Sequence, residues 1–438
     1  MPIKKWFPLS LIGRGCLCFS LLLTGLISPA LGRPDEPPQP ADAAAVRALI
    51  EKVGQFEARL SAVEAENAQL RAMLTHESET NAVKPATPAS QETQPAPQVT
   101  DMGHAGTEGS TNAIPRLQIR GFSDVRYTAS NLRGTTNSFV LGQFNLFITS
   151  RLSDRFSTLA EVVTEADSAN NNFSIELERM MLQYKPSDLF QLGIGRYHTS
   201  IGFYNTAYHH STWLQTTVDR PFLFEFEDGG GILPIHSVGV VASGSTPAGG
   251  LGLHYVAELA NGRAVRTKFG ANPVQNVADE NNGKAFNLAL FSRPEAVPGL
   301  QVGFSGYHDH LTPSVAPNVD EWILAAHAIY QKPNFELLNE MILMRHSPAD
   351  GTPTVNSLGF YSQISSLFGK YRPYFRYEYV NVPDRDLIYP DVHRINGPLF
   401  GLRYNWSEFA AFKIQYGRSM RRQQPSFNTL TLQTSFAF

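Results

Sequence analysis

Two stretches of the sequence carry charges that could act together on dissolved ions. Residues 161–231 contain ten acidic and four basic residues, whereas residues 370–438 contain ten basic and five acidic residues. The residues of interest are Glu225, Glu227 and Asp228 in the acidic stretch, and Arg372, Arg376, Arg403, Lys413 and Arg421 in the basic stretch. Facing each other across a narrow aqueous passage, they would create a transverse field that orients dipolar solutes and focuses ions. Alternatively, these charges only solvate a wet interior, or pair with Glu378 and with one another.

Guanidinium groups in such a passage would suit anionic solutes, because Arg binds phosphate or carboxylate through two parallel hydrogen bonds. A second candidate site is the aromatic segment from residue 204 to residue 213, which includes Tyr204, Tyr208, His209, His210 and Trp213. Aromatic faces beside polar groups would suit a sugar or nucleoside. We favour the simpler interpretation that these rings anchor a loop, because aromatic bodies with polar tips pack well without a ligand.

Histidines occur in two arrangements that could ligate a metal, namely His209-His210 and the run His308-Asp309-His310. Residues i and i+2 of a strand share a face, but neither arrangement has a defined third ligand. We therefore predict no metal site and no cofactor. Glu176 and Glu178 share a strand face, yet nothing identifies them as an acid and a base, and the sequence has no G-x-S-x-G, P-loop or H-E-x-x-H motif. We predict no catalytic residues.

The N-terminus predicts secretion. Residues 1–32 carry three basic residues, an apolar stretch and a small-residue exit, which is typical of a cleaved signal peptide. Cys16 and Cys18 both lie inside this segment, so the mature chain would have no cysteine. That excludes a disulfide scaffold, a thiol nucleophile and a cysteine metal site.

Charge and hydropathy restrict what the rest of the chain can be. Residues 115–438 hold 27 basic and 27 acidic residues. This neutral balance lacks the basic excess that is typical of nucleic-acid binding. After the predicted signal peptide there is no apolar run of about 18 residues, the length that a transmembrane helix needs. If the mature chain spans a membrane, it must do so as a closed β-barrel, which pairs every backbone group.

A heptad pattern follows a short linker at residues 33–45. Within residues 46–74 the seam positions are Val46, Leu49, Val53, Phe56, Leu60, Val63, Asn67, Leu70 and Leu74. This pattern predicts a coiled coil, and a polar residue at an a position such as Asn67 favours self-association in a fixed register. The alternative is a lone amphipathic helix lying on the main domain. Residues 75–114 are rich in Pro, Ala and Thr and are predicted to be a flexible linker.

From residue 115 onward the pattern has a period of two residues. It predicts sixteen strands, at about 116–129, 138–152, 156–167, 173–186, 188–199, 232–245, 248–260, 284–294, 299–309, 319–332, 334–347, 355–368, 370–382, 392–406, 408–422 and 426–438. The connections after odd-numbered strands include long stretches such as 200–231, whereas those after even-numbered strands are tight. Short turns on one side and long loops on the other are typical of an outer-membrane barrel with both termini in the periplasm.

The alternation also predicts which side chains face the lipid. Leu430 and Leu432 alternate with Thr431 and Gln433, so we expect an apolar exterior and a polar, wet interior. Arg196 shares its parity with apolar neighbours, and a charge facing lipid would not be tolerated. Either a bulge near residues 193–195 flips the register, which we prefer, or Arg196 lies beyond the hydrocarbon and meets the loop.

Four features resemble bacterial porins, nearest to the phosphate-selective O and P type. They are the terminal strand ending on Phe438, the segments 117–122 (LQIRGF) and 192–197 (LGIGRY), and the long third loop. The resemblance covers about residues 115–438. It implies that residues 200–231 fold into the lumen and narrow it, and that the protein is a homotrimer.

We therefore expect an all-β transmembrane antiparallel barrel of about sixteen strands, preceded by a short α-helical coiled coil. The expected function is passive diffusion of small hydrophilic solutes, either anions such as phosphate or sugars, across the outer membrane. The expected partners are outer-membrane lipid and two further copies of the chain. The alternative is a structural anchor, in which the coiled coil links the barrel to a periplasmic or cell-wall partner.

Overall fold

The computed structural model describes residues 116–167, 171–208, 212–227, 229–246, 249–265, 276–314 and 316–438. All of them belong to the second of two compact units, which divide between Thr93 and Gln94. The predicted signal peptide (1–32), linkers (33–45 and 75–114) and coiled coil (46–74) lie outside the described residues, as do His209, His210 and Asp228.

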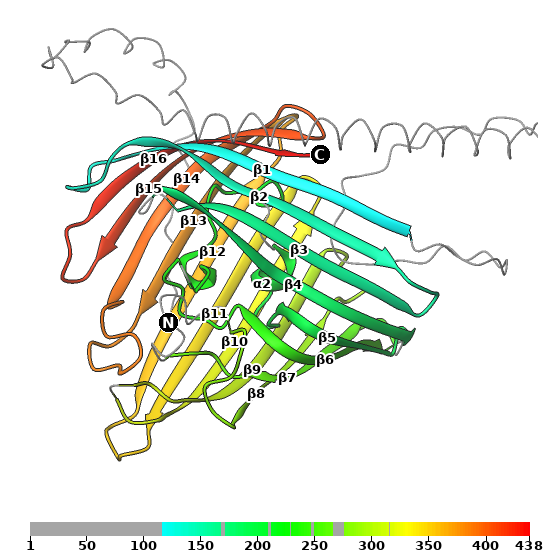
Figure 1. Cartoon of the computed structure of the whole chain (residues 1–438). Coiled ribbons are helices and arrows are strands. Elements are labelled where there is room, and N and C mark those ends of the chain that lie inside the picture. The colour runs from blue at the N-terminus through cyan, green and yellow to red at the C-terminus, as the bar shows by residue number, and fades with distance from the viewer. Residues whose placement is uncertain are drawn as a thin grey trace, which may run out of the picture. The chain divides into compact units, whose positions relative to one another are not determined.

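The described chain forms one closed antiparallel barrel of sixteen strands (Figure 1), which confirms the predicted strand number. The strands are β1 (Arg116–Ser130), β2 (Ser138–Arg151), β3 (Phe156–Asp167), β4 (Asn172–Ser187), β5 (Phe190–His198), β6 (His236–Thr246), β7 (Leu253–Asn261), β8 (Lys284–Ser292), β9 (Leu300–Leu311), β10 (Val319–Lys332), β11 (Phe335–Pro348), β12 (Val355–Ser366), β13 (Tyr371–Asn381), β14 (Arg394–Asn405), β15 (Ala410–Arg421) and β16 (Phe427–Ala437). Each strand pairs with its sequence neighbours, and β1 pairs with β16 to close the ring. Closure leaves no unpaired edge strand.

Side-chain alternation explains why this sheet closes with its apolar face outward. On β16, Leu430 and Leu432 are 41% and 45% exposed, whereas Thr431 and Gln433 are 4% and 3% exposed. The same two-residue period recurs on β10, β11 and β12. An outward apolar surface is what a lipid-embedded barrel presents. No helix in the described part of the chain is long and apolar enough to cross a bilayer.

The connections sort by length as predicted. Residues 333–334 and 406–409 form tight turns after even-numbered strands, and residues 382–393 form a longer loop after β13. The longest connection, residues 199–235 between β5 and β6, is called L3 here. It contains α2 (Tyr204–Ala207) and the 3-10 turn η1 (Phe222–Phe224) and runs inside the ring of strands (Figure 1).

L3 brings its own hydrophobic core into the barrel. Leu223 and Phe224 are at most 1% exposed and belong to one cluster with Ile323, Ile342 and Tyr361 of the inner wall. The interior beneath L3 is therefore not uniformly polar, as was expected, because the inward faces of β10 and β11 also carry apolar side chains such as Ile323 and Ile342, which the loop covers. Burying each such side chain contributes roughly 1.5–3 kcal/mol, which makes L3 part of the folded core.

The region around Arg196 differs from the preferred expectation. Pairing of β5 is continuous through Gly193–Gly195 with both β4 and β6, so no register shift occurs there. The irregularity lies in β4, where a bulge opposite Glu161 and Val162 inserts Glu178. Arg196 is 8% exposed, near the L3 end of β5, and its Nε donates to the backbone carbonyl of Glu178 at 2.9 Å. The second expectation, that Arg196 lies beyond the hydrocarbon and meets the loop, stays a prediction.

A substitution at Gly195 would test this local geometry. The φ of this glycine is +138°, and a Cβ at this position would lie 1.9 Å from the carbonyl oxygen of Met180. We predict that Gly195→Ala lowers the free energy of unfolding by at least about 1–3 kcal/mol, because both the backbone and the contact would be strained. Guanidinium unfolding followed by tryptophan fluorescence measures this. Gly306→Ala is the control, since its nearest non-neighbouring atom is 3.7 Å away. Equal stability of both variants would contradict the local structure.

Candidate functional site

The first part of L3 is held by carboxylates of the barrel wall. Glu340 on β11 accepts hydrogen bonds from the backbone N–H groups of Phe203 (2.5 Å) and Tyr204 (2.9 Å) and from the hydroxyl of Tyr361 (2.6 Å). Glu258 on β7 accepts from the backbone N–H of Ser200 at 2.8 Å. Acidic side chains thus satisfy backbone donors at the start of the loop, including those of α2.

The middle of L3 is held by basic side chains, which donate hydrogen bonds to its backbone carbonyl groups. Arg376 donates to the carbonyls of residues 219 and 220 at 2.9 Å each. Arg403 donates to the carbonyls of residues 213 and 215 at 2.8 Å each. Lys413 donates to the carbonyls of residues 212 and 217 at 2.6 and 2.8 Å. Three neighbouring strands, β13 to β15, therefore bind the loop through its carbonyl oxygens.

The strand register places these cations next to one another, so they require the carbonyl oxygens of the loop to offset their repulsion. Arg372 lies directly opposite Arg403, and Arg403 lies directly opposite Lys413. Like charges directly opposite each other on a sheet repel. Carbonyl oxygens of L3 lie against two of the three groups, and Arg403 also stacks over the Trp213 ring at 5.0 Å.

The predicted basic wall is thus present but mostly occupied by the loop. Arg376 is 1% exposed and Lys413 is 3% exposed, so neither presents a surface to a solute in this structure. Arg372 instead donates to Ser365 and to the carbonyl of Pro333, and Arg421 packs over the Phe427 ring.

The predicted loop acid Glu227 binds the end of L3 and His236 of β6 instead of this wall, which corrects the expectation for this residue. Glu227 accepts from the backbone N–H groups of Ile235 (2.6 Å) and His236 (3.0 Å), and its Oε2 lies 3.1 Å from His236 Nδ1. Burial raises the pKa of Glu227, but His236 and these hydrogen bonds outweigh burial and hold it below its usual value. Glu225 accepts from the backbone N–H of Phe226 at 3.3 Å.

Asp219, an acid of L3 that the sequence did not single out, does reach the basic side. It lies 3.3 Å from Arg126 on β1 and accepts from Gln415 on β15 at 3.2 Å. The Arg126 and Asp219 side chains are 42% and 43% exposed, so this pair is accessible to water inside the barrel. L3 therefore reaches from the β11 wall across to β1.

A cavity lies between L3 and the strands β4–β7. It is lined by Arg179, Gln183, Gln191, Ser200, Thr206 and Glu258 among others.

The aromatic residues of the loop are anchors in this geometry. Tyr204 is 1% exposed and packs against the rings of Phe224 and Tyr361, both with centroids 5.9 Å away. Tyr208 is 8% exposed and donates to Glu336 at 3.1 Å. Their burial leaves no ring face for a sugar.

The His308-Asp309-His310 run is not brought together as a ligand set. His308 stacks between Phe286 and Trp322, with centroids 5.1 and 4.5 Å away, and His310 Nδ1 lies 2.8 Å from Asp320. Within the described ranges, the three metal-ligand-type side chains that do converge are Glu178, His198 and His236.

Another polar cluster ties loop 382–393 to the wall. His346 on β11 lies 2.8 Å from Glu321 and 2.7 Å from Asp386, and Glu321 is also bound by Arg263 from the connection after β7. Burial raises the pKa of Asp386, but hydrogen bonding and the charge of His346 outweigh it and lower the pKa below its usual value.

Neither a protein-family model nor a curated protein matches this sequence. Solved structures do match. The anion-selective porin from Comamonas acidovorans has a TM-score of 0.55 at 12% identity, over 74% of this chain and 100% of that chain. The outer membrane channel DcaP of Acinetobacter baumannii has a TM-score of 0.51 at 10% identity, over 75% and 99%. Salmonella typhi OmpF has a TM-score of 0.50 at 12% identity, over 74% and 97%. The chain therefore has the fold of the sixteen-stranded outer-membrane porins.

Arg376→Gln should loosen L3. It removes three hydrogen bonds to L3 and an ion pair with Glu378 (2.5 Å), and breaking a buried pair typically destabilises a protein by about 3–5 kcal/mol. We expect chymotrypsin to cleave the folded barrel within L3, for example after Phe222, as mapped by mass spectrometry. Arg372→Gln on the same strand face is the matched control and should resist cleavage like the wild type. Equal resistance of Arg376→Gln would contradict the assigned anchoring.

Asp386→Asn should lower stability in a pH-dependent way. Because the folded-state pKa of Asp386 is depressed, its contribution is present above the unfolded value of about 3.9 and is lost as pH falls through the folded value. Guanidinium unfolding at a series of pH values should show the wild type more stable near pH 6, with the difference narrowing as pH falls below about 4. Asp384→Asn, at a side chain 43% exposed, is the control and should change stability by less than about 1 kcal/mol.

Proposed function

We propose that the protein is an outer-membrane diffusion channel for small hydrophilic solutes, narrowed by L3. The observation that carries this proposal is the loop's position. L3 is bound to inward side chains of β11 and β13–β15 and reaches β1 through Asp219, while a cavity lined by both polar and apolar side chains lies between it and β4–β7. A loop held across part of a lumen restricts passage by size and leaves a path for water.

Small anions are the solute class that the accessible charges favour. Arg126, Arg372 and Arg421 lie inside the barrel away from the L3 carbonyls, and guanidinium groups attract phosphate and carboxylate. One of the similar structures is described as an anion-selective porin. Small sugars remain the alternative solute class, although Tyr204 and Tyr208 are too buried to stack on a sugar ring.

The second candidate function is a structural anchor. The observation that favours it is the apolar core that L3 forms with β10–β12, which fills part of the lumen. In this account the predicted coiled coil, residues 46–74, would bind a periplasmic or cell-wall partner. In either account, we propose that the coiled coil joins three copies of the chain, which the mass of the complex in detergent would test.

Liposome swelling separates the two candidates. Vesicles that contain the purified protein are diluted into iso-osmotic solutions of sugars of increasing size and of sodium phosphate. A channel narrowed by L3 predicts rapid swelling with small solutes and a sharp fall with larger ones. Vesicles that do not swell with any solute, although the barrel is folded, would favour the anchor.

Arg126→Glu should shift ion selectivity toward cations. Arg126 is half-exposed inside the barrel next to Asp219, so the substitution replaces the positive member of an accessible pair with a negative charge. One charge interacts with an ion about 4 Å away by about 1 kcal/mol in water, so the cation-to-anion permeability ratio should rise about fivefold or more. Reversal potentials under a salt gradient measure it. The control Arg151→Glu, at a 61% exposed side chain next to Asp154 by the β2–β3 turn, should change the ratio much less.

A further inference from the structure

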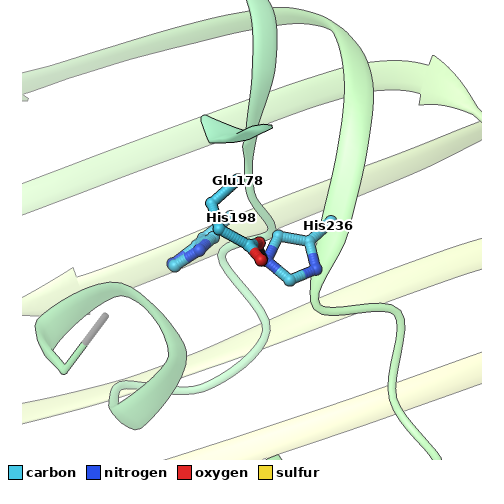
Figure 2. A group of neighbouring side chains, drawn as sticks. All are labelled: Glu178, His198 and His236. Atoms are coloured by element: carbon cyan, nitrogen blue, oxygen red, sulfur yellow. Dashed lines mark ion pairs between the residues drawn. The ribbon is translucent and has the colours of Figure 1, made fainter. Parts of the chain in front are cut away.

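Three buried side chains with metal-binding chemistry meet where both ends of L3 join the wall. Glu178 comes from the bulge of β4, His198 is the last residue of β5, and His236 is the first residue of β6 (Figure 2). Their exposed fractions are 2%, 6% and 4%. Each offers one ligand atom, and these atoms lie within 4.8 Å of one another. His198 and His236 are directly paired across the two strands, so the register itself holds them together.

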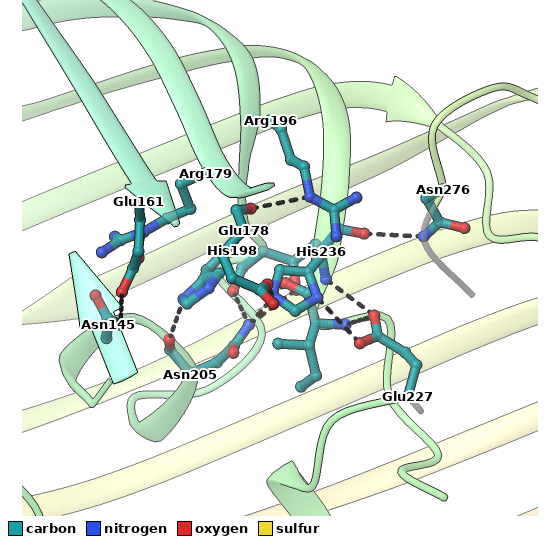
Figure 3. A network of polar contacts seen from close by, with 12 residues as sticks. Asn145, Glu161, Glu178, Arg179, Arg196, His198, Asn205, Glu227, His236 and Asn276 are labelled. Carbon is teal, nitrogen blue, oxygen red and sulfur yellow. Dashed lines mark hydrogen bonds and ion pairs between the residues drawn. The ribbon is translucent and has the colours of Figure 1, made fainter. Parts of the chain in front are cut away.

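Hydrogen bonds of the two imidazoles define which ring nitrogen is available. His198 Nδ1 lies 3.2 Å from the backbone carbonyl oxygen of Asn205, which can only accept, so Nδ1 donates (Figure 3). His236 Nδ1 likewise faces Glu227 Oε2 at 3.1 Å. In the neutral ring, a proton on Nδ1 leaves the lone pair on Nε2. Metal-binding histidines are typically held in this way, by a carbonyl or carboxylate on the nitrogen that does not bind the metal.

Charge also favours a cation at this place. His236 lies between two buried carboxylates, with Nε2 2.7 Å from Glu178 Oε2 and Nδ1 3.1 Å from Glu227 Oε2. Either a second proton on His236 bridges the two carboxylates, or a divalent cation replaces that proton. Tetrahedral zinc, with ligand distances of about 2.0–2.2 Å, needs neighbouring ligand atoms about 3.3 Å apart. Side-chain rotation would have to open the 2.7 Å contact by about half an ångström and shorten separations of up to 4.8 Å to that distance.

We propose that Glu178, His198 and His236 form a binding site for a divalent transition-metal ion of the zinc type. Two imidazoles and one carboxylate are a familiar zinc donor set, and water completes the tetrahedron. The Asn205 carbonyl and the Glu227 carboxylate, both from L3, orient the two imidazoles. The ion would join β4, β5 and β6 at both ends of L3. This site goes beyond the proposed channel function and does not depend on it.

The test uses the full-length mature protein, purified as a folded barrel without a polyhistidine tag and equilibrated with buffered zinc. Atomic emission counts the bound zinc, and the visible spectrum and X-ray absorption of the cobalt-loaded protein report the coordination. We expect about one zinc per chain, a tetrahedral cobalt spectrum and two imidazole ligands. His198→Gln and Glu178→Gln should lose the bound zinc. Glu227→Gln, which only orients His236, should weaken affinity by about 10–100-fold.

His393→Gln is the matched control, because His393 also pairs with a carboxylate, that of Asp384 at 3.0 Å, and should leave zinc binding unchanged. Wild-type protein that binds no zinc would overturn the proposal in favour of a protonated His236 between Glu178 and Glu227. Equal zinc binding by His198→Gln would place the metal elsewhere and also overturn it. Should these variants fail to fold, a wild-type cobalt site with fewer than two imidazole ligands would overturn the proposal on its own, and one with two would support it.

Discussion

The pairing of the L3 backbone is the constraint on which the rest of the structure depends. An irregular loop inside a barrel carries N–H and C=O groups that must find partners away from bulk water. Here charged side chains of the barrel wall are those partners. Glu340 and Glu258 accept from N–H groups at the start of the loop, and Arg376, Arg403 and Lys413 donate to carbonyls in its middle. Acids lie where the loop presents donors, and bases lie where it presents acceptors.

Two features of the barrel follow from that constraint. The row of cations on β13–β15 is stable because L3 carbonyls lie against it, although register places these cations directly opposite one another. Apolar inward side chains such as Ile323 and Ile342 are tolerated because Leu223 and Phe224 cover them. Arg126 and Asp219 form a half-exposed charge pair inside the lumen. The proposed channel would select by the space beside L3 and by a few accessible charges.

The sequence predicted the barrel well, because a two-residue period and alternating loop lengths are local signals. The strands 156–167 and 319–332 were predicted with the bounds that the structure has. The site was predicted less well. Arg403 and Lys413 were found through their strand parity, but no local signal shows that they bind loop carbonyls rather than solutes. Glu336 and Glu340 could have been found by the same parity on strand 334–347. Asp219, and the convergence of Glu178 with His198 and His236, depend on the loop path and a bulge, which parity cannot show.

The central claim is that L3 lines an open water path, and single-channel recording of an Asp219→Cys variant tests it most directly. Cys16 and Cys18 are replaced by Ser, so that residue 219 carries the single thiol. An open water path beside L3 predicts stepwise ohmic currents in planar bilayers and a stepwise fall in current when a charged methanethiosulfonate reagent reaches that thiol. A folded barrel that conducts no current, or a current that the reagent leaves unchanged despite complete labelling, would contradict it.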